Sequence, residues 1–446
     1  MQHNRQPMRF LGIGHCNDLA SMYRGLAERG HEVKVFVEDV DYRDVHRGLL
    51  ELTNDWRQEL GWIADAADDG VIVFESADMG AEQDKLRRAG FQVIGGSELG
   101  DRLEADREFG QQALRHIGLR TASSHGFTAY EDAIHFLKCQ PGRYVLKFNG
   151  ANTPRTRNYI GQLDDGSDML ALLEMYLHHQ PAAGKPEFLL MQHVQGTEVG
   201  VGAYFNGQRF LEGVCIDFEH KRFFPGDSGE LTGEMGTVVS YRGAGKLFNA
   251  TLAPLQEMLA DSGYCGYINV NLMVNKESIW PLEFTSRFGY PGFAICEALH
   301  TEPWETILRR MLKKDSLALP TAAGFAVGVV LTVPPFPYRQ GYEELSKGVP
   351  ICFRTGLTKK DRAALHFAEV ERMGDQLVTS GATGYIGVAT GRGCTLEMAI
   401  AEAYRIASHV VIPNLRYRMD IGHRLMAHDW QALRDMGWLG DDAPAN

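Results

Sequence analysis

The chain has 446 residues, of which 44% are hydrophobic and 23% are charged, a composition typical of a globular protein with an apolar core. At roughly 100 to 200 residues per domain, this length predicts about three packed units. The 45 basic and 57 acidic residues give a formal net charge of -12, which argues against a general affinity for nucleic acid or for an anionic membrane.

The first hundred residues alternate between short apolar runs and an amphipathic segment. The run 10–13 is closed by Gly14, and apolar side chains then recur at i, i+3, i+4 and i+7, which predicts a strand, a turn and a helix. Gly30 ends this helix, and further apolar runs at 33–37, 71–74 and 92–94 read as buried strands. We expect residues 1–100 to form a parallel α/β unit.

The second predicted unit covers residues 101–318 and mixes strands with helices. An apolar spacing that runs on from Leu103 predicts a single helix that stops at Gly118. Lys147 lies on the strand predicted next. Apolar runs place that strand at 144–148. They also predict that strands at 188–194 and 199–205 pair with each other and are joined through Gly196 and Thr197.

The third predicted unit covers residues 319–446 and mixes strands with helices too. A connection of small residues, 316–323, leads to the apolar run 325–333, and a helix is predicted after Thr395. The sequence contains no internal repeat or low-complexity tract. The expected fold class is therefore a combination of α/β and α+β units.

Cysteines and apolar runs indicate the compartment. Seven cysteines are spread along the chain without a C-x-x-C pair, so neither a zinc site nor a disulfide framework is indicated, and we expect reduced thiols. Segment 1–9 is polar and lacks the apolar core of a signal peptide, and no apolar run approaches the roughly 18 residues that span a bilayer. We expect a cytoplasmic protein.

Two general nucleotide-binding motifs are absent from the sequence. Gly12 and Gly14 follow the first strand, but Asn17 stands where the dinucleotide fingerprint needs a third glycine. No G-x-x-x-x-G-K-[ST] phosphate-binding loop occurs either.

Three other segments carry a family resemblance. Residues 219–222 read Glu-His-Lys-Arg, 229–236 read Gly-Glu-Leu-Thr-Gly-Glu-Met-Gly, and 283–291 read Glu-Phe-Thr-Ser-Arg-Phe-Gly-Tyr-Pro. They resemble the Asp-His-Lys-Arg, Gly-Pro-Asn-Thr-Gly-Gly-Met-Gly and Glu-Phe-Asn-Val-Arg-Phe-Gly-Asp-Pro-Glu segments of glycinamide ribonucleotide synthetase (phosphoribosylamine-glycine ligase), an ATP-grasp family. Residues 417–422, Tyr-Arg-Met-Asp-Ile-Gly, extend the similarity toward the carboxy terminus.

This resemblance implies an ATP-grasp fold. Its parts would be an N-terminal parallel α/β (pre-ATP-grasp) domain at 1–100, an ATP-grasp domain at 101–318 and a C-terminal mixed domain at 319–446. The implied activity, similar to a step of purine biosynthesis, is an ATP-dependent carboxylate-amine ligase that forms an acyl phosphate and releases ADP and phosphate.

The resemblance also implies a nucleotide site. Lys147 matches a nucleotide-binding lysine. The segment that would contact the adenine edge begins at Gln192 and ends at Val194, and Glu198 would hold the ribose hydroxyls. Phosphate oxygens need cations or backbone N–H groups in a partly dry cleft. Arg155 and Arg157 offer such cations where the family has a second lysine, although a solvated basic loop is an equal alternative.

A magnesium site follows from the same resemblance. Mg²⁺, or Mn²⁺ in its place, needs hard oxygen ligands and retains several waters. Glu283 takes the ligand role by resemblance, and Thr285 stands where the family has asparagine. Asn271, on the preceding predicted strand, is a candidate to compensate for this change.

Candidate catalytic residues are Arg287, Lys221 and His220. The planar fork of Arg287 suits two oxygens of an acyl phosphate or carboxylate. The resemblance implies that His220, Lys221 and Arg222 line the cleft between nucleotide and substrate, whereas a run of charges is otherwise typical of a solvated face.

Departures from the family motifs leave the substrates open. Tyr290 and Gly292 replace two family acids, and residues 14–20 lack the arginine of the family's Gly-Gly-Arg-Glu-His-Ala. Three hypotheses follow: a ligase for glycine and phosphoribosylamine, a ligase for another carboxylate and amine, and a nucleotide-binding protein without turnover. We expect small-molecule partners, no nucleic acid or membrane, and a monomer or homodimer.

Overall fold

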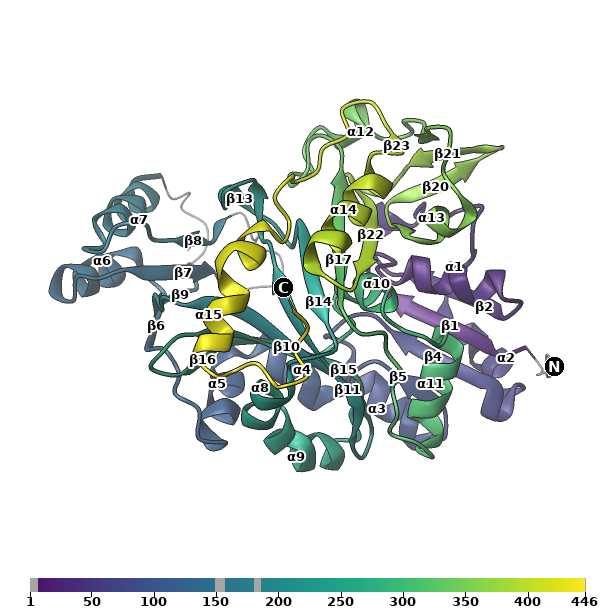
Figure 1. Cartoon of the computed structure of the whole chain (residues 1–446), viewed down its shortest axis with the longest axis horizontal. Coiled ribbons are helices and arrows are strands. Elements are labelled where there is room, and N and C mark those ends of the chain that lie inside the picture. Colours follow the sequence, from purple (N-terminus) through teal and green to yellow (C-terminus); the bar gives the residue numbers. More distant parts are fainter. Residues whose placement is uncertain (1–6, 149–156, 180–185, 446) are drawn as a thin grey trace.

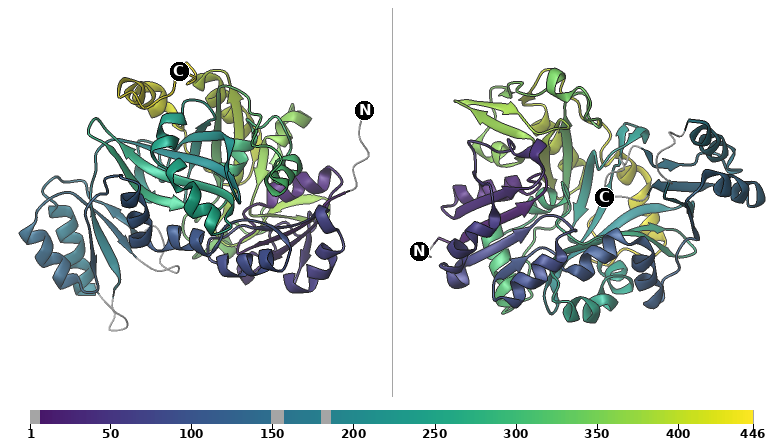
Figure 2. Two further views of the ribbon diagram at one scale, coloured as in Figure 1. Left: turned by 90° about the horizontal axis from the view of Figure 1, so that it is seen from below. Right: turned by 180° about the vertical axis from the view of Figure 1, so that it is seen from behind.

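The computed structural model describes residues 7–148, 157–179 and 186–445. Its larger sheets are a parallel sheet built from the amino-terminal segment, a four-stranded sheet that projects at the opposite end, and an eight-stranded sheet between them (Figures 1 and 2). This arrangement agrees with the predicted combination of α/β and α+β units.

The amino-terminal sheet has the strand order β3-β2-β1-β4-β5, and all its strands are parallel. Helix α1 buries Met22, Tyr23 and Leu26, which is the face that the sequence spacing predicts. The predicted parallel unit is confirmed, while the short edge strand β3 was not foreseen. The elements are β1 (Arg9–Gly14), α1 (Ala20–Glu28), β2 (Glu32–Val37), β3 (Glu51–Thr53), α2 (Leu60–Ala64), β4 (Gly70–Phe74), α3 (Gly80–Arg88) and β5 (Gln92–Ile94).

Two helices, α4 (Glu98–Ala105) and α5 (Arg107–His116), replace the single helix predicted from Leu103 to Gly118. Asp106 interrupts them in an extended conformation, and its carboxylate accepts a hydrogen bond from the backbone N–H of Phe109 at 3.0 Å. This side chain satisfies an N–H that a continuous helix would bond to a preceding carbonyl. The single-helix prediction is therefore wrong because a local cap outweighs the apolar spacing.

The projecting unit contains the strand predicted to carry Lys147. Its four strands are antiparallel in the order β6-β9-β7-β8, and α6 and α7 lie together beside them (Figure 1, left). Lys147 lies on β7, as predicted. The elements are β6 (Ser124–Phe127), α6 (Tyr130–Cys139), β7 (Tyr144–Phe148), β8 (Tyr159–Ile160), α7 (Ser167–His179) and β9 (Phe188–Gln192).

The central sheet has the order β16-β15-β10-β11-β14-β17-β22-β19, and its neighbouring strands are antiparallel. Strand β10 pairs with β11 and β15, whereas β9 pairs with β6 and β7 in the projecting sheet. The predicted pairing of 188–194 with 199–205 is therefore wrong, because each run finds its ladder partners in a different sheet. The strands are β10 (Thr197–Asn206), β11 (Phe210–Glu219), β14 (Gly236–Ser240), β15 (Cys265–Val274), β16 (Ile279–Thr285), β17 (Phe325–Thr332), β19 (Leu365–Phe367) and β22 (Tyr385–Gly393).

Segments on both sides of residue 318 contribute to this central sheet. Strand β14 pairs with β17, and β17 pairs with β22, over which α14 (Leu396–Ala407) packs after its N-cap Thr395. The predicted helix after Thr395 is confirmed, and the division of the chain at 100 and 318 stays a prediction. The remaining elements are β12 (Arg222–Phe224), β13 (Ser228–Leu231), α8 (Gly245–Ala250), α9 (Gln256–Asp261), α10 (Gly292–Glu297), α11 (Trp304–Lys313), α12 (Tyr342–Leu345), β18 (Cys352–Phe353), α13 (Lys359–Ala363), β20 (Val370–Met373), β21 (Gln376–Thr379), β23 (Val410–Val411) and α15 (Trp430–Asp435).

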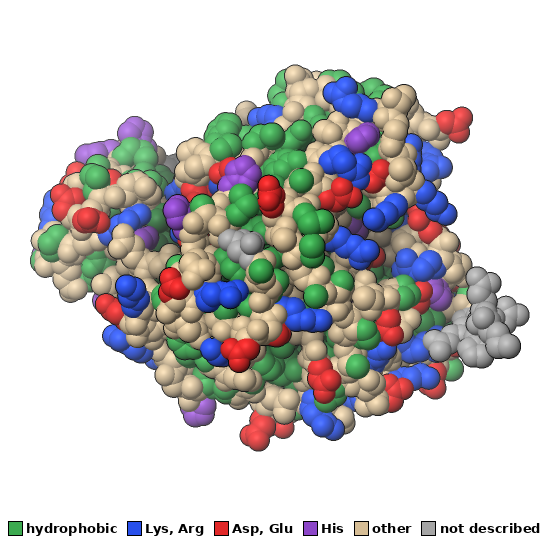
Figure 3. Space-filling view, viewed as in Figure 1, with side chains coloured by type: hydrophobic (Ala, Val, Ile, Leu, Met, Phe, Trp, Pro, Cys, Tyr) green, Lys and Arg blue, Asp and Glu red, His purple; other side chains and the backbone are tan. Residues whose placement is uncertain are grey.

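The surface and the thiols agree with the composition. Acidic and basic side chains are interspersed on the face shown in Figure 3. All seven cysteines are free, as the absence of a cysteine pattern predicts. In the part of the chain that the structure describes, no helix is both long and apolar enough to cross a bilayer.

Candidate active site

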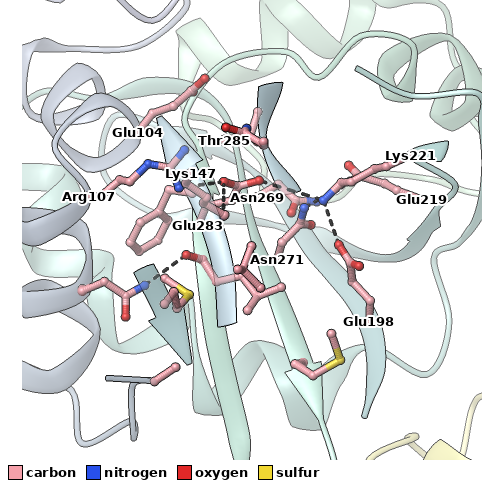
Figure 4. A pocket seen from close by; sticks show the side chains of 18 of the residues that line it. Glu104, Arg107, Lys147, Glu198, Glu219, Lys221, Asn269, Asn271, Glu283 and Thr285 are labelled. Carbon is pink, nitrogen blue, oxygen red and sulfur yellow. Dashed lines mark hydrogen bonds and ion pairs between the residues drawn. The ribbon is translucent and has the colours of Figure 1, made fainter. Parts of the chain in front are cut away.

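A cavity of about 1340 Å³ lies where the projecting sheet and α5 face the central sheet. Its lining comes from β7 and β9 on one side and from β10, β11, β15 and β16 on the other, so that residues far apart in sequence meet (Figure 4). Among them are most of the residues predicted from the sequence: Lys147, Gln192, Val194, Glu198, Lys221, Asn271, Glu283, Thr285 and Arg287.

Glu283, on β16, is surrounded by cationic groups (Figure 4). Its Oε2 atom lies 3.2 Å from Nζ of Lys147 and 3.5 Å from Nη1 of Arg107, and its Oε1 atom lies 3.9 Å from Nζ of Lys221. Burial lowers the pKa of Lys147, and the neighbouring Glu283 carboxylate opposes that shift. One carboxylate thus holds three cations at the point where the two sheets meet.

Lys221 follows β11 and points back over the central sheet. Its Nζ atom lies 2.7 Å from Oε1 of Glu198 and 3.2 Å from Oε2 of Glu219. Burial disfavours the ammonium charge, but these carboxylates outweigh it and raise the pKa of Lys221 well above its ordinary value. Lys221 is therefore a permanently charged group between the predicted ribose ligand and the predicted metal ligand.

Backbone hydrogen bonds connect the charged segment 219–222 with the glycine-rich segment 229–236. The N–H of Met235 donates to the carbonyl of His220 at 2.7 Å, and the N–H of His220 donates to the carbonyl of Gly236 at 2.9 Å. Both the N–H and the hydroxyl of Thr232 donate to the carbonyl of Lys221 at 2.8 Å. Segment 229–236 thereby fixes the backbone from which the Lys221 side chain extends.

Only Lys221 of the predicted charged trio lines the cavity. His220 is buried and does not line the cavity. Its Nε2 atom accepts a hydrogen bond from the N–H of Gly422 at 3.2 Å, and burial lowers its pKa to about 4. Arg222 turns to the carbonyl of Gly229 at 2.7 Å. The expectation that all three side chains line the cleft is wrong for His220 and Arg222, because neighbours in an extended segment point to opposite sides.

The predicted metal ligands lie on adjacent strands. Asn271 is directly opposite Glu283 in the β15–β16 register, and Thr285 is opposite Asn269. The amide N–H of Asn271 donates to Glu219 Oε2 at 3.1 Å, which leaves the amide oxygen as an acceptor. Carboxylate, amide and hydroxyl oxygens are the hard donors that Mg²⁺ needs, so this set fits the ion.

Arg287 is held by an acid from the other side of the cavity. Its Nε atom donates to Oε1 of Glu104 at 3.1 Å, and Glu104 also accepts the N–H of Ser286 at 2.8 Å. Glu104 and, less strongly, the half-buried Asp18 raise the pKa of Arg287. The guanidinium is thus positioned and charged beside Tyr290 and Gly292, which also line the cavity.

The predicted nucleotide-binding segment lies at the cavity edge near β9. The N–H of Gln192 donates to the carbonyl of Ser123 at 2.9 Å, which ties this end of β9 to the preceding segment. Arg157 does not line the cavity: its guanidinium carbon lies 4.4 Å from the ring centroid of Phe148, where it covers the aromatic side chain. Arg155 lies outside the described residues.

Several lining residues were not foreseen. Arg107 and Glu104 come from α5 and α4, and no motif connects these helices with Glu283. Asp217 and Glu219 precede Lys221 at intervals of two residues, so strand alternation places all three on one face. That periodicity was the available signal for the two acids.

Comparisons with known proteins agree with this geometry. Residues 105–293 match the family described as phosphoribosylglycinamide synthetase, ATP-grasp (A) domain. A phosphoribosylamine–glycine ligase of Halalkalibacterium halodurans is 23% identical over 354 residues, which cover 77% of this chain and 79% of the relative. This match extends beyond the region that contains the cavity-lining strands.

Two solved structures share the fold. The phosphoribosylamine–glycine ligase of Thermotoga maritima superposes with a TM-score of 0.67 at 21% identity and covers 93% of this chain and 100% of its own. A biotin carboxylase complex with β,γ-ATP from Campylobacter jejuni gives a TM-score of 0.59 at 12% identity, with 96% and 97% covered. The predicted fold class is confirmed.

Proposed function

We propose that this chain is an ATP-grasp ligase of the phosphoribosylamine–glycine ligase type, which joins a small carboxylate to a small amine through an acyl phosphate and releases ADP and phosphate. The observation that carries the proposal is the meeting of Lys147, Lys221, Glu283 and Arg287 in one cavity. These charges suit a triphosphate and a carboxylate, and the match at 105–293 spans all four.

The nucleotide would lie between the projecting sheet and the central sheet. Gln192 and Val194 supply backbone groups for the adenine edge, and Glu198 supplies an acceptor for the ribose hydroxyls. Lys147 and Lys221 then exchange carboxylate partners for phosphate oxygens, because both are charged and already lie within 4 Å of Glu283. The biotin carboxylase neighbour with β,γ-ATP supports a nucleotide in this fold.

Glu283, Asn271 and Thr285 are the residues that would hold Mg²⁺ or Mn²⁺. When bound, the ion would neutralise phosphate charge and make the γ-phosphorus a better electrophile. Glu283 is suited to this role since the cations around it can move to phosphate when ATP enters.

The chemical sequence follows from the charges. A substrate carboxylate oxygen attacks the γ-phosphorus, the bond to the β-phosphate oxygen breaks, and ADP leaves. The amine nitrogen then attacks the acyl carbon, phosphate departs, and the nitrogen loses a proton. Arg287 would hold the carboxylate and then the acyl phosphate through its paired donors, while Lys221 stabilises the transferring phosphoryl group.

We propose substrates that differ from glycine and phosphoribosylamine. The segment that opens α1 lacks the family's arginine, and the N–H of its Asp18 donates to the Glu75 carboxylate at 2.7 Å. This segment therefore offers no guanidinium to a sugar phosphate. Tyr290 and Gly292 also change the pocket beside Arg287.

The test is ADP release by the purified protein with ATP and Mg²⁺, across a panel of carboxylates and amines that includes glycine with phosphoribosylamine prepared in place. Lys147→Ala is the blank, and Lys85→Ala, an exposed lysine of α3, is its matched control. Release that needs a carboxylate and an amine together, and that Lys147→Ala removes, supports the ligase.

The products and substrate pair decide among the alternatives. AMP with pyrophosphate would contradict an acyl phosphate mechanism. Release restricted to glycine with phosphoribosylamine would contradict the diverged substrates, and ATP binding without release on any pair would contradict the ligase.

A further inference from the structure

The cavity lining contains two buried acids for which the ligase mechanism above gives no role. Asp217, near the end of β11, is 5% exposed, and Glu234, just before β14, is 6% exposed. Both line the same cavity as Arg287 and Glu283. Thr237 is directly opposite Glu219 in the β11–β14 register and donates its hydroxyl to Glu234, so Glu234 lies beside the strand face that carries Asp217 and Glu219.

One oxygen of Asp217 has no partner. Oδ2 accepts a hydrogen bond from the amide of Asn269 at 2.6 Å, but Oδ1 is buried and has no hydrogen-bond donor among the described residues. Gly200 is directly opposite Asp217 in the sheet, and a Cβ atom there would lie 2.0 Å from Oδ1. Because Gly200 has no side chain, it leaves room for the Asp217 carboxylate.

The protein supplies no dedicated counter-charge for these acids. Within the described part of the chain no ion pair includes Asp217 or Glu234. The charge of Lys221 lowers the pKa of both acids, but Lys221 itself forms ion pairs with Glu198 and Glu219. Burial raises the pKa of Asp217 to about 8 and that of Glu234 well above its usual value. A buried carboxylate without a cation is costly, so a cationic ligand would be strongly favoured here.

The side chains around Asp217 and Glu234 suit an organic ammonium ion. The neighbours include groups that suit an N–H donor, since the hydroxyl of Tyr290 is buried without a partner and Thr237 already bonds Glu234. A small ammonium group can donate to several such oxygens at once.

We propose that Asp217 and Glu234 bind a protonated primary amino group of a substrate in the cavity. This inference rests on the proposed ligase function and assigns the charge class of one substrate. The group belongs either to an amino acid, whose carboxylate would face Arg287, or to the amine that the ligase consumes. Glu234 stands where the aligned family motif has glycine, so this chain has gained an acid here.

The experiment measures equilibrium binding by titration calorimetry with Mg²⁺ and the non-hydrolysed analogue AMP-PNP present. The probes are the proteinogenic amino acids, methylammonium, ethylenediamine and putrescine. For every probe that binds, the analogue with hydrogen or hydroxyl in place of the amino group is titrated as well. Binding of amino acids alone identifies the carboxylate substrate as the source, whereas binding of simple amines identifies the amine substrate.

We expect at least one ammonium compound to bind and its analogue without the amino group to bind far more weakly. Asp217→Asn and Glu234→Gln should each raise the Kd of that compound by about tenfold to a hundredfold, because a hydrogen bond to a charged group is lost. Glu212→Gln, an exposed acid on the same strand β11, is the matched control and should leave Kd unchanged. An unchanged Kd for AMP-PNP in each variant shows that the fold is intact.

Three results would overturn the inference: no ammonium compound binds, the analogues without the amino group bind equally well, or neither substitution weakens binding. If Asp217→Asn does not fold, Glu234→Gln decides alone. The calorimetric result needs no turnover, so it is separate from the ligase test. Asp217-dependent binding without ADP release would support the ammonium site and contradict the ligase function. Ligase activity with an unchanged KM in both variants would support the ligase function and contradict the ammonium site.

Discussion

Nζ of Lys147 lies 3.2 Å from Oε2 of Glu283, and this ion pair connects β7 of the projecting sheet with β16 of the central sheet. The two residues are 136 positions apart in the sequence. The contact therefore depends on how the two sheets are placed, and any ligand that replaces Glu283 as the partner of Lys147 also acts on that placement.

Replacing Glu283 tests the assigned metal position. We expect Glu283→Ala to lower Mg²⁺-dependent kcat/KM by about a hundredfold or more, because the substitution removes the carboxylate ligand and leaves Lys147 beside Arg107 without their shared acid. Steady-state ADP release at several Mg²⁺ concentrations measures the effect. Glu257→Ala, at an exposed position of α9, serves as the control. Near-normal turnover would contradict the assignment.

Glu198 tests the nucleotide position. Glu198→Ala should weaken ATP binding by about tenfold through loss of a hydrogen bond to the ribose, with a smaller change in kcat. The same change frees Lys221 from its shortest ion pair, so Glu198→Gln is included to separate charge from hydrogen bonding. Calorimetry measures the Kd of ATP for each variant, and Glu277→Ala, on an exposed turn, is the control. Equal Kd values in Glu198→Ala and the parent protein would remove Glu198 from the ribose site.

Glu75 makes stability depend on pH. Burial raises its pKa from 4.5 to about 8, so between these values the folded state retains a proton that the unfolded chain has lost. The free energy of unfolding should therefore fall as pH rises from about 4.5 to about 8, by an amount on the order of a few kcal/mol. In Glu75→Gln this part of the fall should disappear.

Urea unfolding at several pH values measures the Glu75 contribution as a difference from the parent protein. The difference is needed because buried His220 and His366, whose pKa values are lowered to about 4, act in the opposite direction between about pH 4 and 6.5. Glu397→Gln, an exposed acid in the first turn of α14, should not alter the profile. Parallel profiles for Glu75→Gln and the parent would refute the prediction.

Asp106 tests the break between α4 and α5. Asp106→Ala should lower the free energy of unfolding by about 1 kcal/mol, because the N–H of Phe109 loses its cap. Asp106→Asn keeps an acceptor oxygen and should retain most of the stability. Urea denaturation of both variants provides the comparison, and equal losses would show that the cap is not the cause.

The sequence predicted the strands and the charged motifs better than their pairing. Lys147, Glu198 and Glu283 were identified through the family resemblance, and all three line the cavity. Arg107 was missed, since its approach to Glu283 depends on packing between α5 and β16, which no local pattern records. The single helix failed at Asp106, where a side-chain cap competes with the apolar spacing.

Strand alternation explains the errors and omissions around Lys221. His220 was grouped with Lys221 because both belong to one motif, yet adjacent residues of an extended segment face opposite sides. The same rule places Asp217 and Glu219 with Lys221 on the cavity face. The exchange of sheets between β9 and β10 was hidden for another reason: both are apolar runs, and such runs do not specify their partners.

The central sheet also dictates an order of events during synthesis. Strand β14, with all five residues buried, ends at Ser240, but its neighbour β17 is complete only at Thr332. At ribosomal rates of about 5 to 20 residues per second, the apolar edge of β14 waits unpaired for roughly 5 to 20 seconds. A nascent chain of this protein therefore passes through an interval in which the unpaired N–H and C=O groups of β14 are exposed. Slower translation between these strands would lengthen the period in which a chaperone is needed.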